Sequence, residues 1–376
     1  MNFLFGVFMK VKKSGANYSA IVSIGEKLKK MSLETGEEYL YLNRGINAVV
    51  NIDLSKIIPL IDFNSVDIQV YPPNNGRKQL RDAINTEFFQ DTIDSDDLFV
   101  VSGGMNGLRL ITEVLDVDKI HISKLFWGAY TNLMKVNSVE FEHYDNFEEL
   151  SNNIESLKGS AVIICDPNNP VGNKYDDEML FSLAKKLTDN GVTVIWDGPY
   201  RRLFMDNSDT LYSRLAKLEN LIIVESFSKS IGLSGQRIGF VYSSDKGFKN
   251  EFKIHLLYTA NGVNAFSQLL IEKILTTDEG KLAANNFKEK TSADIAENIK
   301  YLMENNLLAK RFYTDSIPKG IFVIVNKTFD ELLSKRIGSV SLPYFTTLPK
   351  EEALKYSRIC VSVPHEKFKS FFNKLS

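Results

Sequence analysis

The sequence predicts an α/β fold: a three-layer sandwich with a mostly parallel central sheet, together with a smaller α/β domain. Short apolar runs that are typical of buried strands alternate with amphipathic stretches of helical spacing. The apolar runs end in polar or glycine-rich loops, and in such sheets the loops at the carboxyl ends of the strands build the binding site. Beyond about residue 255 the pattern changes to longer helical stretches with two further strands.

The elements follow in chain order. A helix is predicted over 15–32 from the spacing of its apolar residues, and a short strand follows at 40–42. Leu80, Ile84 and Phe88 share one face of a helix that follows the turn at 72–76. Buried strands are predicted at 98–101, 120–122, 162–165, 192–196, 221–224 and 238–242, and later at 321–325 and 359–363. Helices are predicted near 108–115, 180–187, 264–276 and 284–310.

These elements divide the chain into three parts. We expect residues 61–255 to form the large domain and residues 256–376 the small one, with the N-terminal segment 1–60 packing against the small domain.

Composition excludes several classes of function. The chain has 376 residues and a net charge of −2, so it lacks the basic surface that nucleic acids require. The four histidines do not pair at ligand spacing, so no metal site is expected. Cys165 and Cys360 give no disulfide framework and fit a cytoplasmic location.

The N-terminus raises a separate question. The apolar run at 3–9 precedes its lysines, which is the reverse of a signal peptide, and no run is long enough to cross a membrane. Either Met1 or Met9 fits as the start of translation.

Three loops at predicted strand ends carry candidate site residues. The first, Ser102–Gly107, holds Gly103, Gly104 and Met105 and leads into a helix, an arrangement that points backbone amides at an anion. The second, Asp166–Gly172, contains Asn169, and the third begins at Asp197. The glycine spacing fits neither a P-loop nor a dinucleotide fingerprint.

Lys229 lies on a short connection rich in small residues between two predicted strands. It is either a basic residue in a surface turn or an amine kept to form a Schiff base with a carbonyl, a reaction for which burial suits lysine. The surrounding residues favour the second interpretation, because Ser226, Ser228 and Arg237 supply the hydroxyls and the guanidinium that a phosphate dianion prefers.

Together these motifs resemble the pyridoxal-phosphate-dependent aminotransferases of class I/II, the fold type I enzymes of the aspartate aminotransferase superfamily. The resemblance runs from about Leu42 to Arg358. It implies pyridoxal 5′-phosphate (PLP) as cofactor and catalytic roles for Lys229, Asp197 and Tyr200. It also implies cofactor contacts from Gly103, Gly104, Met105, Trp127, Asn169, Asp197, Tyr200, Ser226, Ser228, Lys229 and Arg237, and from Tyr71 of a neighbouring subunit.

The resemblance also suggests a reaction. Arg358, Gly45 and Asn169 are expected to bind the substrate carboxylate, and a homodimer with shared active sites is expected from Tyr71. The predicted function is a ping-pong transamination between an L-amino acid and a 2-keto acid, with a PLP-dependent lyase or decarboxylase as the alternative.

The substrate side chain stays open at this stage. Candidate pocket residues are Arg44, Tyr130, Asn132, Arg201, Arg202, Tyr258 and Asn261. Arg201 and Arg202 are expected on a solvated face instead.

Overall fold

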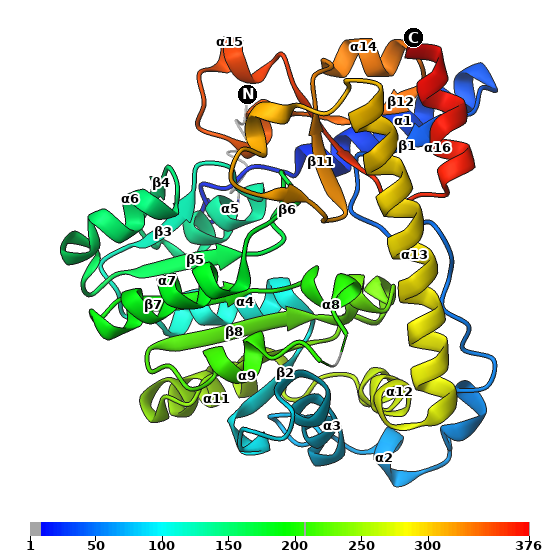
Figure 1. Cartoon of the computed structure of the whole chain (residues 1–376). Coiled ribbons are helices and arrows are strands. Elements are labelled where there is room, and N and C mark those ends of the chain that lie inside the picture. The colour runs from blue at the N-terminus through cyan, green and yellow to red at the C-terminus, as the bar shows by residue number, and fades with distance from the viewer. Residues whose placement is uncertain (1–8, 207, 376) are drawn as a thin grey trace, which may run out of the picture.

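The computed structural model describes residues 9–206 and 208–375, and it confirms the predicted α/β class (Figure 1). Its central sheet has seven strands in the order β2-β9-β8-β7-β5-β3-β4, and all are parallel except β9. The strands, in that order, are Leu98–Val101, Gly239–Tyr242, Leu221–Ser226, Thr193–Asp197, Ala161–Cys165, Ile120–Ser123 and Phe141–Tyr144.

Helices cover both faces of this sheet. On one face, Ile163, Ile195 and Val224 pack against α4 (Gly104–Val114), α5 (Gly128–Asn137) and α11 (Lys246–Ala260). On the other face, alternate strand residues pack against α3 (Lys78–Phe89), α6 (Phe147–Asn152), α7 (Asp177–Asp189), α9 (Leu211–Leu215) and α12 (Ala265–Thr276). This alternation of side chains along each strand produces the three layers.

A second group of strands lies beside the large sheet. It comprises an antiparallel sheet ordered β11-β14-β13 and the parallel pair β1-β12. The bounds are β11 Phe322–Val325, β14 Ser357–Cys360, β13 Val340–Ser341, β1 Leu40–Tyr41 and β12 Ile337–Gly338. A short ribbon of β6 (Asn173–Lys174) and β10 (Ile317–Pro318) connects the two regions.

The remaining helices complete the molecule. They are α1 (Ala20–Thr35), α2 (Val66–Gln69), α8 (Arg201–Phe204), α10 (Phe227–Ser230), α13 (Asp278–Glu304), α14 (Phe329–Ser334), α15 (Lys350–Ala353) and α16 (His365–Phe372). The long helix α13 runs along one side of the molecule, from α12 to the region of β11 and α16 (Figure 1). The domain boundaries at 60/61 and 255/256 stay predictions.

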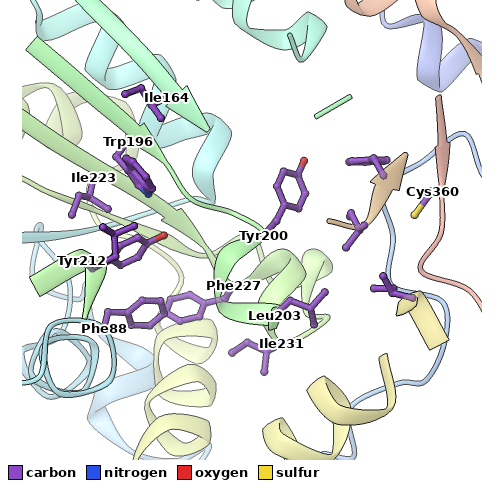
Figure 2. Packing of buried hydrophobic residues seen from close by; sticks show 14 of the residues in the cluster. Phe88, Ile164, Trp196, Tyr200, Leu203, Tyr212, Ile223, Phe227, Ile231 and Cys360 are labelled. Atoms are coloured by element: carbon purple, nitrogen blue, oxygen red, sulfur yellow. The ribbon is translucent and has the colours of Figure 1, made fainter. Parts of the chain in front are cut away.

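One hydrophobic cluster joins the large sheet to the second strand group. Figure 2 shows Trp196 and Ile223 of the large sheet, Tyr200 and Leu203 beyond the end of β7, and Cys360 of β14 within it. The rings of Phe88 and Phe227 meet edge to face, with centroids 5.9 Å apart. Because Phe227 directly precedes Ser228 and Lys229, this packing fixes the helical turn that carries the lysine.

The N-terminal helix differs from the prediction. It begins at Ala20 instead of residue 15 and extends to Thr35. Gly15 has a φ of +73°, which a helix does not allow, and Gly36 adopts the left-handed conformation that ends the helix. The question of Met1 or Met9 concerns residues 1–8, which lie outside the described part of the chain. Among the described residues, no helix is long and apolar enough to span a membrane.

Candidate functional site

A cavity of about 540 Å³ opens at the carboxyl ends of β5, β7 and β8, where the sequence predicted the site. Its lining brings together most of the predicted residues. From the large-sheet region come Gly104, Met105, Trp127, Asn169, Asp197, Tyr200, Ser226, Ser228, Lys229 and Arg237, and from the N-terminal segment and second strand group come Gly45 and Arg358. The site therefore needs both regions of the fold.

Lys229 lies on α10, directly after β8, and its ammonium group donates a hydrogen bond to the carbonyl oxygen of Gly45. Burial, together with the charges of Arg237, Arg358 and Arg44, lowers its pKa from 10.5 to about 8. The amine is thus kept close to the neutral form that a nucleophile requires.

Asp197 ends β7 and is almost fully buried. Burial raises the pKa of its carboxyl group to about 7. The hydrogen bond of 2.5 Å that Tyr130 Oη donates to Asp197 Oδ2 acts in the opposite direction and lowers the pKa. No lysine or arginine forms an ion pair with Asp197 among the described residues. A buried carboxylate in this state is suited to a ligand that brings a positive charge or a proton.

The loop before α4 and the residues after β8 form a cup of hydrogen-bond donors. Ser226 Oγ lies 3.0 Å from Ser228 Oγ, and the Arg237 guanidinium donates to Ser228 Oγ at 3.4 Å. Gly103 has a φ of +83°, and a Cβ built there would lie 2.7 Å from Arg237 Nη2. Glycine thus lets the guanidinium approach the N-terminal end of α4, where backbone amides and the helix dipole favour an anion.

Arg358 on β14 is fully buried without a carboxylate partner among the described residues. Its guanidinium stacks over Phe322 and Phe345, at 4.2 and 4.5 Å from their ring centroids. It donates to Asn169 Oδ1 at 3.1 Å and to the carbonyl oxygen of Asn43, whereas Nε has no partner. Burial lowers the pKa of this arginine to about 10. An unneutralised guanidinium on a cavity wall is suited to binding a carboxylate.

Some candidates lie elsewhere. Tyr71 is exposed and does not line the cavity, so its predicted role requires a second subunit and stays a prediction. Arg44 and Tyr130 line the cavity, whereas Asn132, Tyr258 and Asn261 do not. Gly103 does not line the cavity itself but lies beside the guanidinium of Arg237, which does.

The expectation for Arg201 and Arg202 is wrong, because both are buried. Arg201 forms bidentate ion pairs with Asp177 and with Asp209, and Arg202 pairs with Glu87 at 2.9 Å. Their carboxylate partners offset the cost of burying them.

Two contacts were not anticipated from the sequence. The first is the bond from Tyr130 to Asp197. The second is made by Asn47, whose Nδ2 donates to the Lys229 carbonyl oxygen at 2.6 Å while its Oδ1 accepts from Ser362 Oγ at 2.8 Å. Asn47 thereby connects the lysine turn to the end of β14. The sequence offered one signal for Asn47. This residue lies two positions after Gly45, which was already expected at the site.

Comparison with known proteins identifies the family. The family model described as "Aminotransferase class I and II" matches residues 52–375. This chain belongs to that family. A protein of Methanocaldococcus jannaschii named "Probable aspartate aminotransferase" is 27% identical over 274 residues, which cover 68% of this chain and 69% of that protein. A histidinol-phosphate aminotransferase of Christiangramia forsetii is 30% identical over 56% of this chain and 59% of its own length.

Solved structures agree on the fold. The aspartate aminotransferase of Thermus thermophilus, solved with maleate, superposes with a TM-score of 0.83 over 98% of this chain and 100% of that one, at 17% identity. An archaeal alanine:glyoxylate aminotransferase gives a TM-score of 0.82 at 18% identity, over 96% of this chain and 95% of that one. The predicted fold type and the predicted class of enzyme, a PLP-dependent aminotransferase, are confirmed, and nothing in the comparisons favours a lyase or decarboxylase.

The cavity fits the cofactor on which the family depends. The donor cup beside Gly103 suits a phosphate, Lys229 suits an aldehyde, and the buried Asp197 suits a protonated ring nitrogen. These three features lie on the walls of one cavity, so a single molecule can use them together.

Proposed function

We propose that this protein moves an amino group between an L-amino acid and a 2-keto acid in two half-reactions, with PLP held in the cavity through Lys229. When bound, PLP supplies an aldehyde that condenses with amines and a ring that accepts electrons from the substrate Cα. The observation that carries the proposal is the buried Lys229, with its lowered pKa, in one cavity with Asp197 and the donor cup.

Lys229 is the proton carrier in this proposal. Its neutral Nζ takes the proton from the substrate Cα and later returns a proton on the cofactor side. A pKa of about 8 supports this role, since a general base works best when its pKa lies near the operating pH. The carbonyl oxygen of Gly45, which accepts a hydrogen bond from Nζ, positions the amine whenever Lys229 is not linked to PLP.

The remaining walls orient the cofactor. Asp197 keeps a proton on the ring nitrogen, and Tyr130 holds its carboxylate in position. We assign the ring oxygen to Tyr200 and Asn169, and the face of the ring to Trp127. We assign the phosphate to the side chains of Ser226, Ser228 and Arg237 and to the backbone amides of Gly104 and Met105.

The substrate carboxylate is assigned to Arg358. Stacking against Phe322 and Phe345 fixes the orientation of the planar guanidinium, so it can offer two parallel N–H groups. Asn169 and Gly45 complete this contact. Retention of the carboxylate directs the reaction toward transamination.

We also propose a homodimer with shared active sites. Support comes from exposed apolar side chains on two adjacent segments, Phe63, Val66, Val70, Tyr71, Ile254 and Tyr258. These segments meet where Asn74 bonds to the Lys253 carbonyl and where Pro72 contacts Gly262. A second copy covering this area would bring Tyr71 toward a neighbouring phosphate. We place the protein in the cytoplasm, which its two free cysteines support.

Borohydride reduction followed by peptide mapping tests the proposal. PLP should be found attached to Lys229, and the Lys229→Ala variant should bind PLP without a covalent link. A panel of L-amino acids should then shift the cofactor absorbance of the wild-type protein in the absence of any keto acid. Attachment at another lysine, or no spectral change with any amino acid, would contradict the assignment.

A further inference from the structure

The pairing between β7 and β8 stops where these strands deliver Asp197 and Ser226, the residues assigned to the ring nitrogen and the phosphate of the cofactor. The last backbone bond between the strands runs from the Gly198 amide to the Val224 carbonyl oxygen. In a parallel ladder of this register, the next bond would run from the Ser226 amide to the Gly198 carbonyl oxygen. Both of these groups have side-chain partners instead.

Glu225 and Tyr212 are the partners. Glu225 Oε1 accepts the hydrogen bond from the Ser226 amide at 2.8 Å. Tyr212 Oη, on α9, lies 2.7 Å from Glu225 Oε2 and 3.4 Å from the Gly198 carbonyl oxygen. A Cβ built at Gly198 would lie 1.8 Å from that hydroxyl, so the tyrosine reaches the strand end because residue 198 is a glycine. The two side chains therefore take the place of one ladder bond.

The number of hydrogens in this network indicates its protonation state. A tyrosine hydroxyl has a single hydrogen, yet it bonds to two oxygens here. Both bonds form together when Glu225 is the protonated acid, which donates to Tyr212 Oη while Tyr212 donates to Gly198. Glu225 is completely buried, and in the described part of the chain no lysine or arginine forms an ion pair with it. Burial raises the pKa of its carboxyl group to about 8, although the bond from the Ser226 amide acts in the opposite direction.

Other ionisable groups surround Glu225 on several elements. They are Asp197 of β7, Arg202 of α8, Lys288 of α13 and Cys165 of β5. Asp197 raises the pKa of Glu225, and Arg202 lowers it. A phosphate bound at Ser226 would add negative charge next to Glu225 and would favour the neutral acid.

The aromatic core keeps Tyr212 in this place. Its ring stacks on Phe88 with centroids 6.2 Å apart, and Phe88 meets Phe227 edge to face (Figure 2). Since Phe227 directly follows Ser226, Tyr212 supports the phosphate-binding turn through ring packing as well as through hydrogen bonds.

From this geometry we propose that Glu225 and Tyr212 are positioning residues for the phosphate end of the cofactor site. They hold the Ser226 turn away from Gly198, in place of the ladder bond that would draw the two strand ends together. The inference rests on the proposed function, because it takes Ser226 as a phosphate donor. A neutral Glu225 can lie this close to a bound phosphate, whereas an ionised one would repel it.

Binding of pyridoxine 5′-phosphate to the full-length apoprotein tests this proposal. The probe carries the ring and the phosphate but no aldehyde, so it does not condense with Lys229. In calorimetric titrations at pH 7, Tyr212→Phe and Glu225→Leu should each raise the Kd on the order of 10-fold, because each leaves buried polar groups unpaired. Glu225→Gln should stay within about 2-fold of wild type, because its amide accepts from Ser226 and donates to Tyr212.

Tyr242→Phe is the matched control. The buried Tyr242 hydroxyl also donates to a backbone carbonyl oxygen, that of Ala216, but Tyr242 pairs with Ile223, away from the Ser226 turn. This variant should lower the Tm about as much as Tyr212→Phe does while leaving the Kd unchanged. Equal Kd values for the two tyrosine variants would overturn the proposal.

The pH dependence of the same binding gives a second readout. Lys229 also titrates in this range, so the ratio of the wild-type Kd to the Glu225→Gln Kd isolates the carboxyl group. The ratio should be about 1 at pH 6.5 and should rise on the order of 10-fold by pH 9, since only the wild-type side chain becomes anionic. A ratio that is constant with pH would contradict a neutral Glu225 beside the phosphate.

The possible failures are distinguishable. If the wild-type protein does not bind pyridoxine 5′-phosphate, the assigned cofactor site is wrong, and the proposed function and this inference fall together. If the wild-type protein binds the probe and Tyr212→Phe and Glu225→Leu bind it equally well, the positioning role is wrong while the aminotransferase assignment stands.

Discussion

Arg201 and Arg358 are both buried, at 0% and 1% exposure, yet their surroundings differ in charge. Arg201 lies among Asp177 and Asp209, with N–O distances of 2.6 to 2.9 Å, and Asp166 lies 3.8 Å away. Burial alone would lower its pKa, but the hydrogen bonds that Arg201 donates to Asp177 and Asp209 outweigh burial and raise it. Arg358 has aromatic rings and neutral oxygens around it, and burial lowers its pKa to about 10.

The difference separates two uses of a buried charge. The charge of Arg201 is satisfied within the chain, so the arginine serves the fold next to Tyr200. The charge of Arg358 is left for a ligand, and the folded protein carries the cost of burying it. A buried cation without a carboxylate, on the wall of a cavity, is therefore the stronger indication of a binding site.

The largest expected effect tests the first half of this comparison. Arg201→Met would leave Asp177 and Asp209 without their main partner and should lower the free energy of unfolding by about 3–5 kcal/mol. Urea denaturation measures the change. Arg214→Met is the matched control, since its ion pair with Glu178 is on the surface, and it should cost less than about 1 kcal/mol. Equal losses in the two variants would contradict the structural role of Arg201.

Lys229 extends the comparison to pH. Its pKa is about 8 in the folded chain and 10.5 in the unfolded chain, so the unfolded state binds more protons between these values, and stability rises with pH across that window. In the apoprotein, Lys229→Met should raise the free energy of unfolding at pH 7 by up to about 3 kcal/mol. This advantage should decline between pH 8 and 10.5. A stability difference that does not vary with pH would show that burial does not lower the pKa of Lys229.

Arg358→Met tests the second half. We expect kcat/KM to fall on the order of 100-fold, because two charge-assisted hydrogen bonds to the substrate carboxylate are lost. The unfolding free energy of the apoprotein should stay the same or rise, since an unpaired buried cation is removed. Steady-state kinetics and urea denaturation on the same preparation separate the two effects. A loss of stability as large as that of Arg201→Met would show that Arg358, like Arg201, stabilises the fold, which contradicts the comparison.

Asn47 gives the smallest expected effect. Asn47→Ala leaves the Lys229 carbonyl oxygen and Ser362 without the bonds that Asn47 provides, which should cost about 1–2 kcal/mol of stability. The pH dependence of the cofactor absorbance should also shift, because the lysine turn is held less firmly. Asn51→Ala, an exposed position in the same segment, is the control. If both variants keep the wild-type absorbance profile, Asn47 has no positioning role.

The local features of the fold could be predicted from the sequence. The strands around Ile163, Ile195 and Ile223 are short apolar runs, and the glycine-rich turn at Gly103 leads directly into a helix. Such signals lie within a few neighbouring residues, as does the group Ser226, Ser228 and Lys229. For the same reason the candidate cavity residues of these loops were found before the structure was known.

Contacts between distant segments could not be predicted in this way. Asn47 and Lys229 are 182 positions apart, and Tyr130 and Asp197 are 67 apart. Arg201 was expected in solvent because a pair of adjacent arginines is usually solvated. Its partners Asp177 and Asp209 lie 24 and 8 positions away, and nothing in the sequence marks them as a set.

Phe322 on β11 places a limit on how the enzyme can be re-engineered. A methyl group added at Gly45 would come within 2.3 Å of its ring, and one added at Gly172 would come within 1.8 Å of its carbonyl oxygen. The same ring supports Arg358 and packs against Tyr200. A mutant library that seeks a new amino donor should therefore keep Gly45, Gly172 and Phe322 fixed. Lining residues with exposed side chains, such as Ile46 and Met105, are better positions for changes in size, because their side chains reach solvent.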